Sequence, residues 1–185
     1  MNGVAIRPYR LDDATALHEA ALESVAAIQP FMAWCHPDLT VGDIRIWLEV
    51  QVAAFEALKA FEFAIVAADG RFLGGCGLNH LDDANRRANL GYWVRTSAAG
   101  RGVATEAVRQ LVRWAFESTD LIRLEVVVST RNAPSLGVAE KAGAWREGIL
   151  RHRLLIHGEP HDAVLFSFIR HAATIEAEPG NFPLD

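Results

Sequence analysis

The sequence has few of the features that mark secreted, metal-binding or membrane-spanning proteins. Its 185 residues include only two cysteines, Cys35 and Cys76, and neither belongs to a group at metal-site or redox spacing. We therefore expect two reduced thiols and no metal site. Charges interrupt every apolar run before it could span a bilayer, and residues 1–10 contain no apolar core of signal-peptide length. A soluble, cytoplasmic protein without a membrane partner is expected.

Lysine is also scarce, and positive charge is distributed unevenly. Lys59 and Lys141 are the only lysines, whereas eleven of the sixteen arginines fall between Arg86 and Arg153. The formal net charge of −5 is opposite to the basic surplus of a general nucleic-acid binder, so no nucleic-acid partner is expected. An arginine-rich stretch in an acidic chain fits a small phosphorylated ligand, and it equally fits scattered surface ion pairs.

No internal repeat, low-complexity tract or linker divides the chain. We expect one domain over residues 1–170, followed by a polar tail over residues 171–185. Hydrophobic periodicity and turn residues predict strands over residues 4–8, 61–67, 72–78, 88–95, 123–128, 145–156 and 162–168. Residues 30–37 and 79–85 are predicted to be loops. Helices are predicted after Asp12 or Asp13, from about Thr40, and over residues 103–117 and 132–142.

This order of elements predicts the fold class. Strands that alternate with helices, together with an antiparallel meander over residues 61–95, indicate a mixed α/β (α+β) protein. We expect a central, mostly antiparallel mixed sheet of about seven strands, covered by helices on both faces.

One glycine-rich turn has the character of an anion site. Gly100-Arg101-Gly102-Val103-Ala104 lies between a predicted strand and a predicted helix. Glycines allow close approach of the backbone, and the first N–H groups of a helix attract negative charge. A pyrophosphate fits there without a metal, although a tight turn would use the same glycines. The chain has no P-loop pattern, and a dinucleotide fingerprint would require glycine at Thr105 and an acid at Val128.

Two downstream segments decide between these readings. Asn132-Ala133-Pro134-Ser135 follows a predicted buried strand, and Glu140-Lys141-Ala142-Gly143 closes the next helix. Together with Gly91-Tyr92-Trp93 and the turn, they resemble the acetyltransferases of the GNAT superfamily, in particular the bacterial ribosomal-protein N-terminal acetyltransferases of the RimJ/RimL type. The resemblance runs from Ile6 to Arg170. It implies an acetyltransferase fold and an enzyme that uses acetyl-CoA as cosubstrate, without a metal, to acetylate a primary amine.

The resemblance also implies which residues bind the cosubstrate. Main-chain groups of Trp93, Val94 and Thr96 would pair with the pantetheine arm. Backbone N–H groups along the turn would hold the pyrophosphate, with Gly100, Arg101, Gly102, Val103, Ala104 and Thr105 as the residues concerned. Asn132 would hydrogen-bond the pantetheine, and its alternative role is the N-cap of the helix that follows.

Two further roles concern the reaction itself. Ser135 matches the position proposed to protonate the leaving thiolate, and its alternative is a solvent-facing hydroxyl. Trp34 matches a substrate-binding position, and its alternative is a hydrophobic anchor for the loop. Because no cysteine lies in these motifs, direct attack of the amine in a ternary complex is expected.

Two positions depart from the family pattern. Asn89 stands where the family often has an acid, so the general base is unassigned; the candidates are His80, Asp82, Asp83 and Glu147. Ala144 stands where phenylalanine is common, and Trp145 is the candidate to fill that space.

The acceptor and the assembly stay open. The acceptor is either a protein N-terminus, such as that of a ribosomal protein, or a small amine such as a polyamine, an amino acid or an aminoglycoside. A noncatalytic CoA-binding module and an NAD-binding dehydrogenase are the alternatives to this enzyme. A homodimer is also left open.

Overall fold

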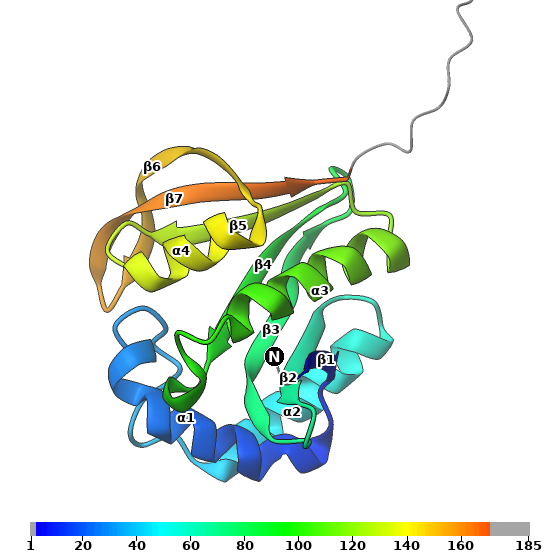
Figure 1. Cartoon of the computed structure of the whole chain (residues 1–185), viewed down its shortest axis with the longest axis vertical. Helices are drawn as coiled ribbons and strands as arrows, with labels where there is room; N and C mark the ends of the chain where they lie inside the picture. Colours follow the sequence, from blue (N-terminus) through cyan, green and yellow to red (C-terminus); the bar gives the residue numbers. More distant parts are fainter. Residues whose placement is uncertain (1–2, 171–185) are drawn as a thin grey trace, which may run out of the picture.

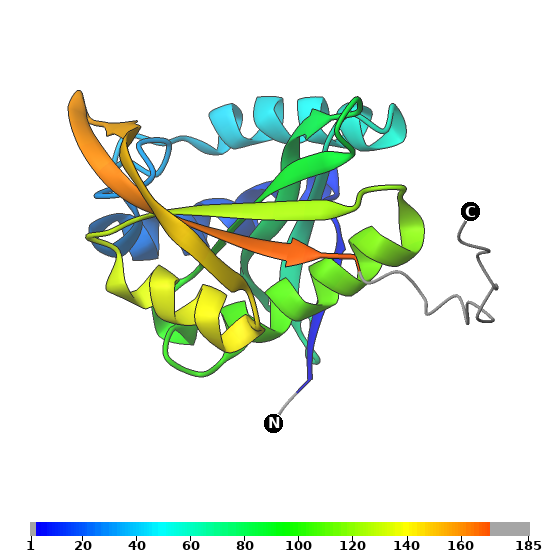
Figure 2. The same cartoon turned by 90° about the horizontal axis from the view of Figure 1, so that it is seen from above.

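A seven-stranded sheet runs through the middle of the protein, with helices on both faces (Figures 1 and 2). The computed structural model describes residues 3–170, so the predicted tail over residues 171–185 lies outside the described part. The strands are β1 (Val4–Pro8), β2 (Phe61–Ala67), β3 (Phe72–Asp82), β4 (Arg87–Val94), β5 (Arg123–Ser129), β6 (Trp145–Ile156) and β7 (Glu159–Ile169). Their order in the sheet is β1-β2-β3-β4-β5-β7-β6, and only β4 and β5 pair in parallel. The predicted mixed, mostly antiparallel sheet is confirmed.

Four helices cover the sheet. They are α1 (Ala14–Ile28), α2 (Val41–Glu56), α3 (Val103–Ser118) and α4 (Ala133–Ala142), with short 3-10 turns η1 (Leu11–Asp13) and η2 (Thr96–Ala98). Helices α1 and α2 lie on one face of the sheet, and α3 and α4 lie on the other (Figure 2). Thr40 caps α2 through a reciprocal pair with Asp43, and left-handed Gly143 ends α4. No helix within residues 3–170 is both long and apolar enough to cross a membrane.

Side-chain alternation along β2 divides the interior into two clusters. Phe61, Phe63 and Ile65 pack with α3, whereas Ala64 packs with α1 and α2. The two cysteines are buried in different clusters, Cys76 in the first and Cys35 in the second. Glu62 therefore points toward the α1 and α2 face, between two buried phenylalanines of the opposite face.

Three local predictions were wrong. Strand β3 continues to Asp82 instead of ending at Leu78, because its end pairs with the beginning of β4. Strand β7 begins at Glu159 instead of at residue 162, because its beginning pairs with the end of β6. Trp145 does not fill the space beside Ala144, since its side chain is 73% exposed on edge strand β6.

The two parallel strands separate soon after they meet. Strand β4 pairs with β5 only where Arg87–Asn89 faces Arg123–Glu125. Beyond that point the strands diverge, and the ends of α3 and α4 border the opening (Figure 1). The main-chain groups of residues 90–94 that point toward β5 therefore lack a strand partner, and this edge is where a ligand could pair with β4.

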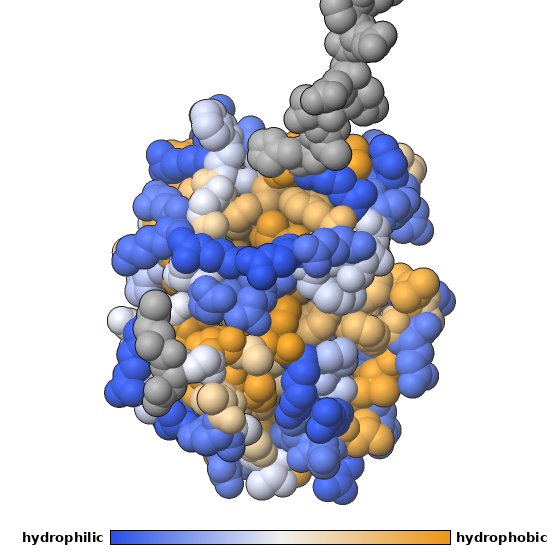
Figure 3. Space-filling view, turned by 45° about the vertical axis from the view of Figure 1, so that its right-hand side comes forward, coloured by the Kyte–Doolittle hydropathy of each residue, from blue (hydrophilic) through white to orange (hydrophobic). Residues whose placement is uncertain are grey.

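The arginine-rich stretch is used, at least in part, for ion pairs. Arg87, Arg95, Arg123 and Arg131 each contact an acidic side chain. The face drawn in Figure 3 accordingly mixes hydrophilic and hydrophobic patches. These ion pairs account for the four arginines without a phosphorylated ligand, so the expectation of such a ligand rests on the glycine-rich turn.

Phe166→Ala should lower the free energy of unfolding by about 3–5 kcal/mol, because Phe166 is fully buried and its removal leaves a cavity in the core. Ile149→Ala on the neighbouring strand is the control, since Ile149 is 57% exposed and should cost about 0.5 kcal/mol. Urea denaturation measures both. Equal losses would show that the first cluster, to which Phe166 belongs, does not carry the stability of this sheet.

Candidate active site

The glycine-rich turn combines an unusual backbone with open space. Gly100 and Gly102 both adopt left-handed conformations, with φ of +72° and +78°. A Cβ at either position would meet no other part of the chain over residues 3–170 within 4 Å, so open space lies beside them there. The N–H of Glu106 donates to the Gly102 carbonyl at 3.0 Å, and the N–H groups of residues 103–105 precede this first helical bond. The turn therefore offers unpaired donors beside open space, which suits an anion.

Helix α1 holds the segment that leads into this turn. The Arg95 guanidinium forms an ion pair with Glu23, and the Ser97 N–H donates to the same carboxylate at 2.7 Å. These contacts, Arg95 first, lower the pKa of Glu23 to about 2. The Thr96 N–H donates to the Ser24 hydroxyl at 2.9 Å, and its carbonyl accepts from Ala99 at 3.1 Å. A pantetheine contact by Thr96 would thus use its side chain or the second lone pair of its carbonyl.

Asn132 has one end of its amide free for a ligand. Its Oδ1 accepts a hydrogen bond from the Ser135 N–H at 3.2 Å and so caps α4. Its Nδ2 has no hydrogen-bond partner within residues 3–170. Capping uses the oxygen and a ligand contact would use the nitrogen, so the two roles do not compete.

Tyr92 brings β4 and α4 together. The Ser135 hydroxyl donates to Tyr92 Oη at 3.0 Å, and Tyr92 Oη donates to the Ser135 carbonyl at 2.9 Å. Burial raises the pKa of Tyr92 to about 12, which keeps the phenol protonated. Tyr92 belongs to the Gly91-Tyr92-Trp93 motif, but no role was predicted for its side chain. A contact between residues 43 positions apart leaves no local pattern in the sequence.

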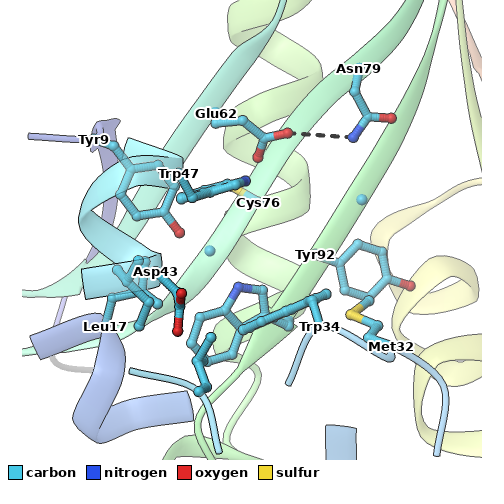
Figure 4. Close-up of a pocket in the computed structure, with 15 residues that line it drawn as sticks. Tyr9, Leu17, Met32, Trp34, Asp43, Trp47, Glu62, Cys76, Asn79 and Tyr92 are labelled. Carbon is cyan, nitrogen blue, oxygen red and sulfur yellow. Dashed lines mark hydrogen bonds between the residues drawn. The ribbon is translucent and has the colours of Figure 1, made fainter. Parts of the chain in front are cut away.

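A cavity of about 340 Å³ opens between the sheet and the segments of α1, α2 and the loop that joins them (Figure 4). Five aromatic rings line it, those of Tyr9, Trp34, Trp47, Tyr92 and Trp93. Trp34 lies edge-on to Trp93 with ring centroids 5.3 Å apart, and Tyr9 contacts Trp47 at 5.2 Å. Trp34 thus anchors its loop and faces the cavity at once. Tyr92 also lines this cavity, which links it to Ser135.

Glu62 contributes the cavity's most buried carboxyl group (Figure 4). Asn79 Nδ2 donates to its Oε1 at 3.4 Å, and burial raises the pKa of Glu62 to about 7. Glu62 was not among the site residues predicted from the sequence, because an acid within a strand is typical of an ordinary outward-facing position. Its only signal was its place between two phenylalanines.

The four base candidates from the sequence all lie elsewhere. None of His80, Asp82, Asp83 and Glu147 lines the cavity. Hydrogen bonds from Asn85 and Arg87 lower the pKa of Asp82, and those from Ser167 and Arg123 lower the pKa of Glu147. Both carboxylates are tied to neighbours and poorly suited to accept a proton at neutral pH.

Strand β4 thus has an open edge toward β5, leads into the anion-suited turn before α3, and lines the aromatic cavity. Residues 4–144 match the family model of the acetyltransferase (GNAT) domain, which is well over half of the chain. The chain belongs to the GNAT acetyltransferases. The family inferred from its motifs is confirmed.

Individual relatives differ in what they acetylate. The putative ribosomal N-acetyltransferase YdaF of Bacillus subtilis is 36% identical over 102 residues, which cover 55% of this chain and 56% of that protein. The spermidine N(1)-acetyltransferase of Escherichia coli is 23% identical over 180 residues, covering 92% of this chain and 88% of that one. The alignments span only 56–64% of the first three curated relatives.

A solved structure shares both sequence and fold. RimJ of Mycobacterium smegmatis, in complex with CoA-disulfide, is 27% identical and superposes with a TM-score of 0.82. The match covers 90% of this chain and 81% of that chain. This relative binds a coenzyme A species on the same fold.

Proposed function

We propose that the chain is a single domain over residues 1–170 that transfers the acetyl group of acetyl-CoA to the N-terminal α-amine of a protein, such as a ribosomal protein. Tyr92 is the observation that carries this proposal. It lines the aromatic cavity and also exchanges hydrogen bonds with Ser135 at the start of α4. An acceptor in the cavity and a cosubstrate between β4 and α4 would therefore meet at one residue.

The residues present fit acetyl-CoA. The open edge of β4 at Trp93 and Val94 would pair with the pantetheine arm, and the free amide nitrogen of Asn132 would donate to it. The pyrophosphate would accept hydrogen bonds from the backbone N–H groups of residues 100–105, beside the left-handed glycines. When bound, acetyl-CoA supplies the acetyl group and departs as a thiolate.

We assign Ser135 as the proton donor to that thiolate; its hydroxyl, which donates to Tyr92 Oη at 3.0 Å, would turn toward the sulfur. A route through an acetylated cysteine is unfavourable. Cys76 is the one cysteine that lines the cavity, and burial raises the pKa of its thiol far above neutrality. These groups support direct attack by the amine.

The cavity favours a protein N-terminus over a polyamine. Its lining is mainly aromatic and aliphatic, with Glu62 and Asp43 as the two carboxyl groups, and Asp43 is engaged by Thr40 at 2.6 Å. A polyamine would bring further ammonium groups into an apolar space without free partners. The name of the B. subtilis relative points to the same class, while that of the E. coli relative keeps small amines as the second candidate.

Free-thiol release from acetyl-CoA, measured across N-terminal peptides and small amines, tests the proposal. We expect kcat/KM for at least one peptide to exceed that for spermidine by about tenfold or more, since each misplaced charge costs at least about 1.4 kcal/mol. Higher activity with spermidine would assign the small-amine function. Binding of acetyl-CoA without turnover on any acceptor would instead indicate a noncatalytic module.

A further inference from the structure

We propose that Glu62 accepts the proton of the incoming amine, and that the cavity around it is built for an α-ammonium group. This proposal rests on the proposed N-acetyl transfer and names the missing base of that reaction. The family position for an acid is Asn89 on β4, and the carboxyl group comes here from β2 instead.

Two glycines of β3 make room for this arrangement. Glu62, Gly77 and Gly91 occupy one row across β2, β3 and β4. A Cβ on Gly77 would lie 2.0 Å from Glu62 Oε2, and a Cβ on Gly75 would lie 2.2 Å from Tyr9 Oη. The carboxyl and the phenol therefore lie directly against the backbone of β3, where any side chain would displace them.

A chain of amides links Glu62 to the position of the missing acid. Asn89 Nδ2 donates to Asn79 Oδ1 at 2.9 Å, and Asn79 Nδ2 donates to Glu62 Oε1 at 3.4 Å. Both side-chain amides are oriented so that their N–H groups point toward Glu62, and this orientation stabilises its negative charge. The position of the family's acid, Asn89, is thus connected to a carboxylate, that of Glu62, through two side-chain amides.

The charges around Glu62 call for a cation. No lysine, arginine or histidine of the described chain lines the cavity, and Glu62 has no ion-pair partner there. The other titratable groups near it are Tyr9 and Cys76, kept neutral by burial, Asp43 across the cavity, and Glu56 from α2. A buried carboxylate without a cation is costly, and a bound ammonium would supply the missing charge.

The aromatic lining suits the same ligand. Tyr9, Trp47 and Glu62 point into one space, with Trp34 and Met32 at the other end of the view (Figure 4). An ammonium group is attracted to aromatic faces, most strongly where water is excluded. The cavity would therefore bind the charged amine through its aromatic side chains and the Glu62 carboxylate. Its apolar remainder would accommodate the side chain of the N-terminal residue that bears this amine.

Proton affinity selects the class of amine. The Glu62 pKa of about 7 lies close to that of an α-amine, about 7.7–8.0, and far below the value of about 10.4 for an alkyl side-chain amine. Transfer of the proton to Glu62 is therefore much less unfavourable for an α-amine than for an alkyl amine. An N-terminal residue or a free amino acid matches this base, and a polyamine does not.

The protons balance across the whole reaction. One proton of the ammonium moves to Glu62, and the amine nitrogen then bonds to the acetyl carbon as the carbon–sulfur bond breaks. The second nitrogen proton replaces the one that Ser135 gives to the sulfur. Glu62 also lines a second hollow of about 200 Å³ beside Gln51 and Glu56, through which its proton can return to solvent.

The pH dependence of Glu62→Gln tests the proposal, with Glu147→Gln as the matched control at an exposed, paired carboxylate. For the wild type, kcat/KM with an N-terminal peptide should rise with pH through an inflection near 7 as Glu62 loses its proton. Glu62→Gln should lower kcat/KM at neutral pH by about 10²–10⁴-fold, abolish that inflection, and keep acetyl-CoA affinity unchanged. Glu147→Gln should match the wild type.

An unchanged rate and pH profile in Glu62→Gln would overturn the proposal. A wild type that binds acetyl-CoA but turns over no acceptor would contradict the proposed function instead, so the two failures are distinct. Asn79→Ala provides a test that keeps the carboxylate. Because the Asn79 hydrogen bond lowers the pKa of Glu62, its loss should move the inflection to higher pH, and an unmoved inflection would also overturn the proposal.

Discussion

Gly102→Asp should reduce the affinity for acetyl-CoA by about 100-fold or more, which corresponds to about 2.7 kcal/mol. Gly102 stands in a left-handed conformation beside open space, at the start of α3. A carboxylate there would face the proposed pyrophosphate and compete for the free N–H groups, each worth about 1.5–3 kcal/mol when it binds a charged oxygen. Thermal unfolding with acetyl-CoA measures the effect, since ligand at about 100 times its Kd stabilises by about 2.7 kcal/mol.

Gly102→Asn separates charge from backbone strain. Asparagine and aspartate have the same shape and both tolerate the left-handed region, but only aspartate is charged. We expect the Asn variant to keep most of its affinity. Equal loss in both variants would point to the backbone, and unchanged affinity in Gly102→Asp would show that the turn does not hold the pyrophosphate.

Ser135→Ala should lower kcat by about 10²–10⁴-fold and leave acetyl-CoA affinity unchanged, because it removes a proton donor rather than a binding group. The helix should be preserved, since Asn132 caps α4 through the Ser135 backbone and not through its hydroxyl. Single-turnover measurement of thiol release reports this step directly. Ser118→Ala, at the exposed far end of α3, is the matched control and should behave as wild type.

Tyr92→Phe tells whether the two hydroxyls act together. Ser135 Oγ donates to Tyr92 Oη, so a shared role predicts that the double variant is little slower than Ser135→Ala alone. Additive losses would mean that they act separately. Full activity of Ser135→Ala would exclude Ser135 as the proton donor and leave the phenol of Tyr92 as the alternative.

Most elements were predictable because their signals are local. Strand β2 and strand β6 begin and end where alternation and turn residues place them, and α4 runs between its Asn132 cap and Gly143. The end of β3 was not predictable in this way. Residues 79–82 are polar and read as loop, but pairing with β4 satisfies their backbone.

The amino-acid sequence by itself determined the family, the glycine-rich turn and the Asn132–Ser135 segment, because each is a short run of neighbouring residues. Only the tertiary structure decided which carboxylate faces the acceptor. Glu62, Asn79 and Asn89 come from three strands and meet through cross-strand register, and the glycines of β3 leave the space they occupy. The carboxylate that we propose as the base therefore lies on a different strand from Asn89, since a site requires a group at a point in space and not at a point in the chain.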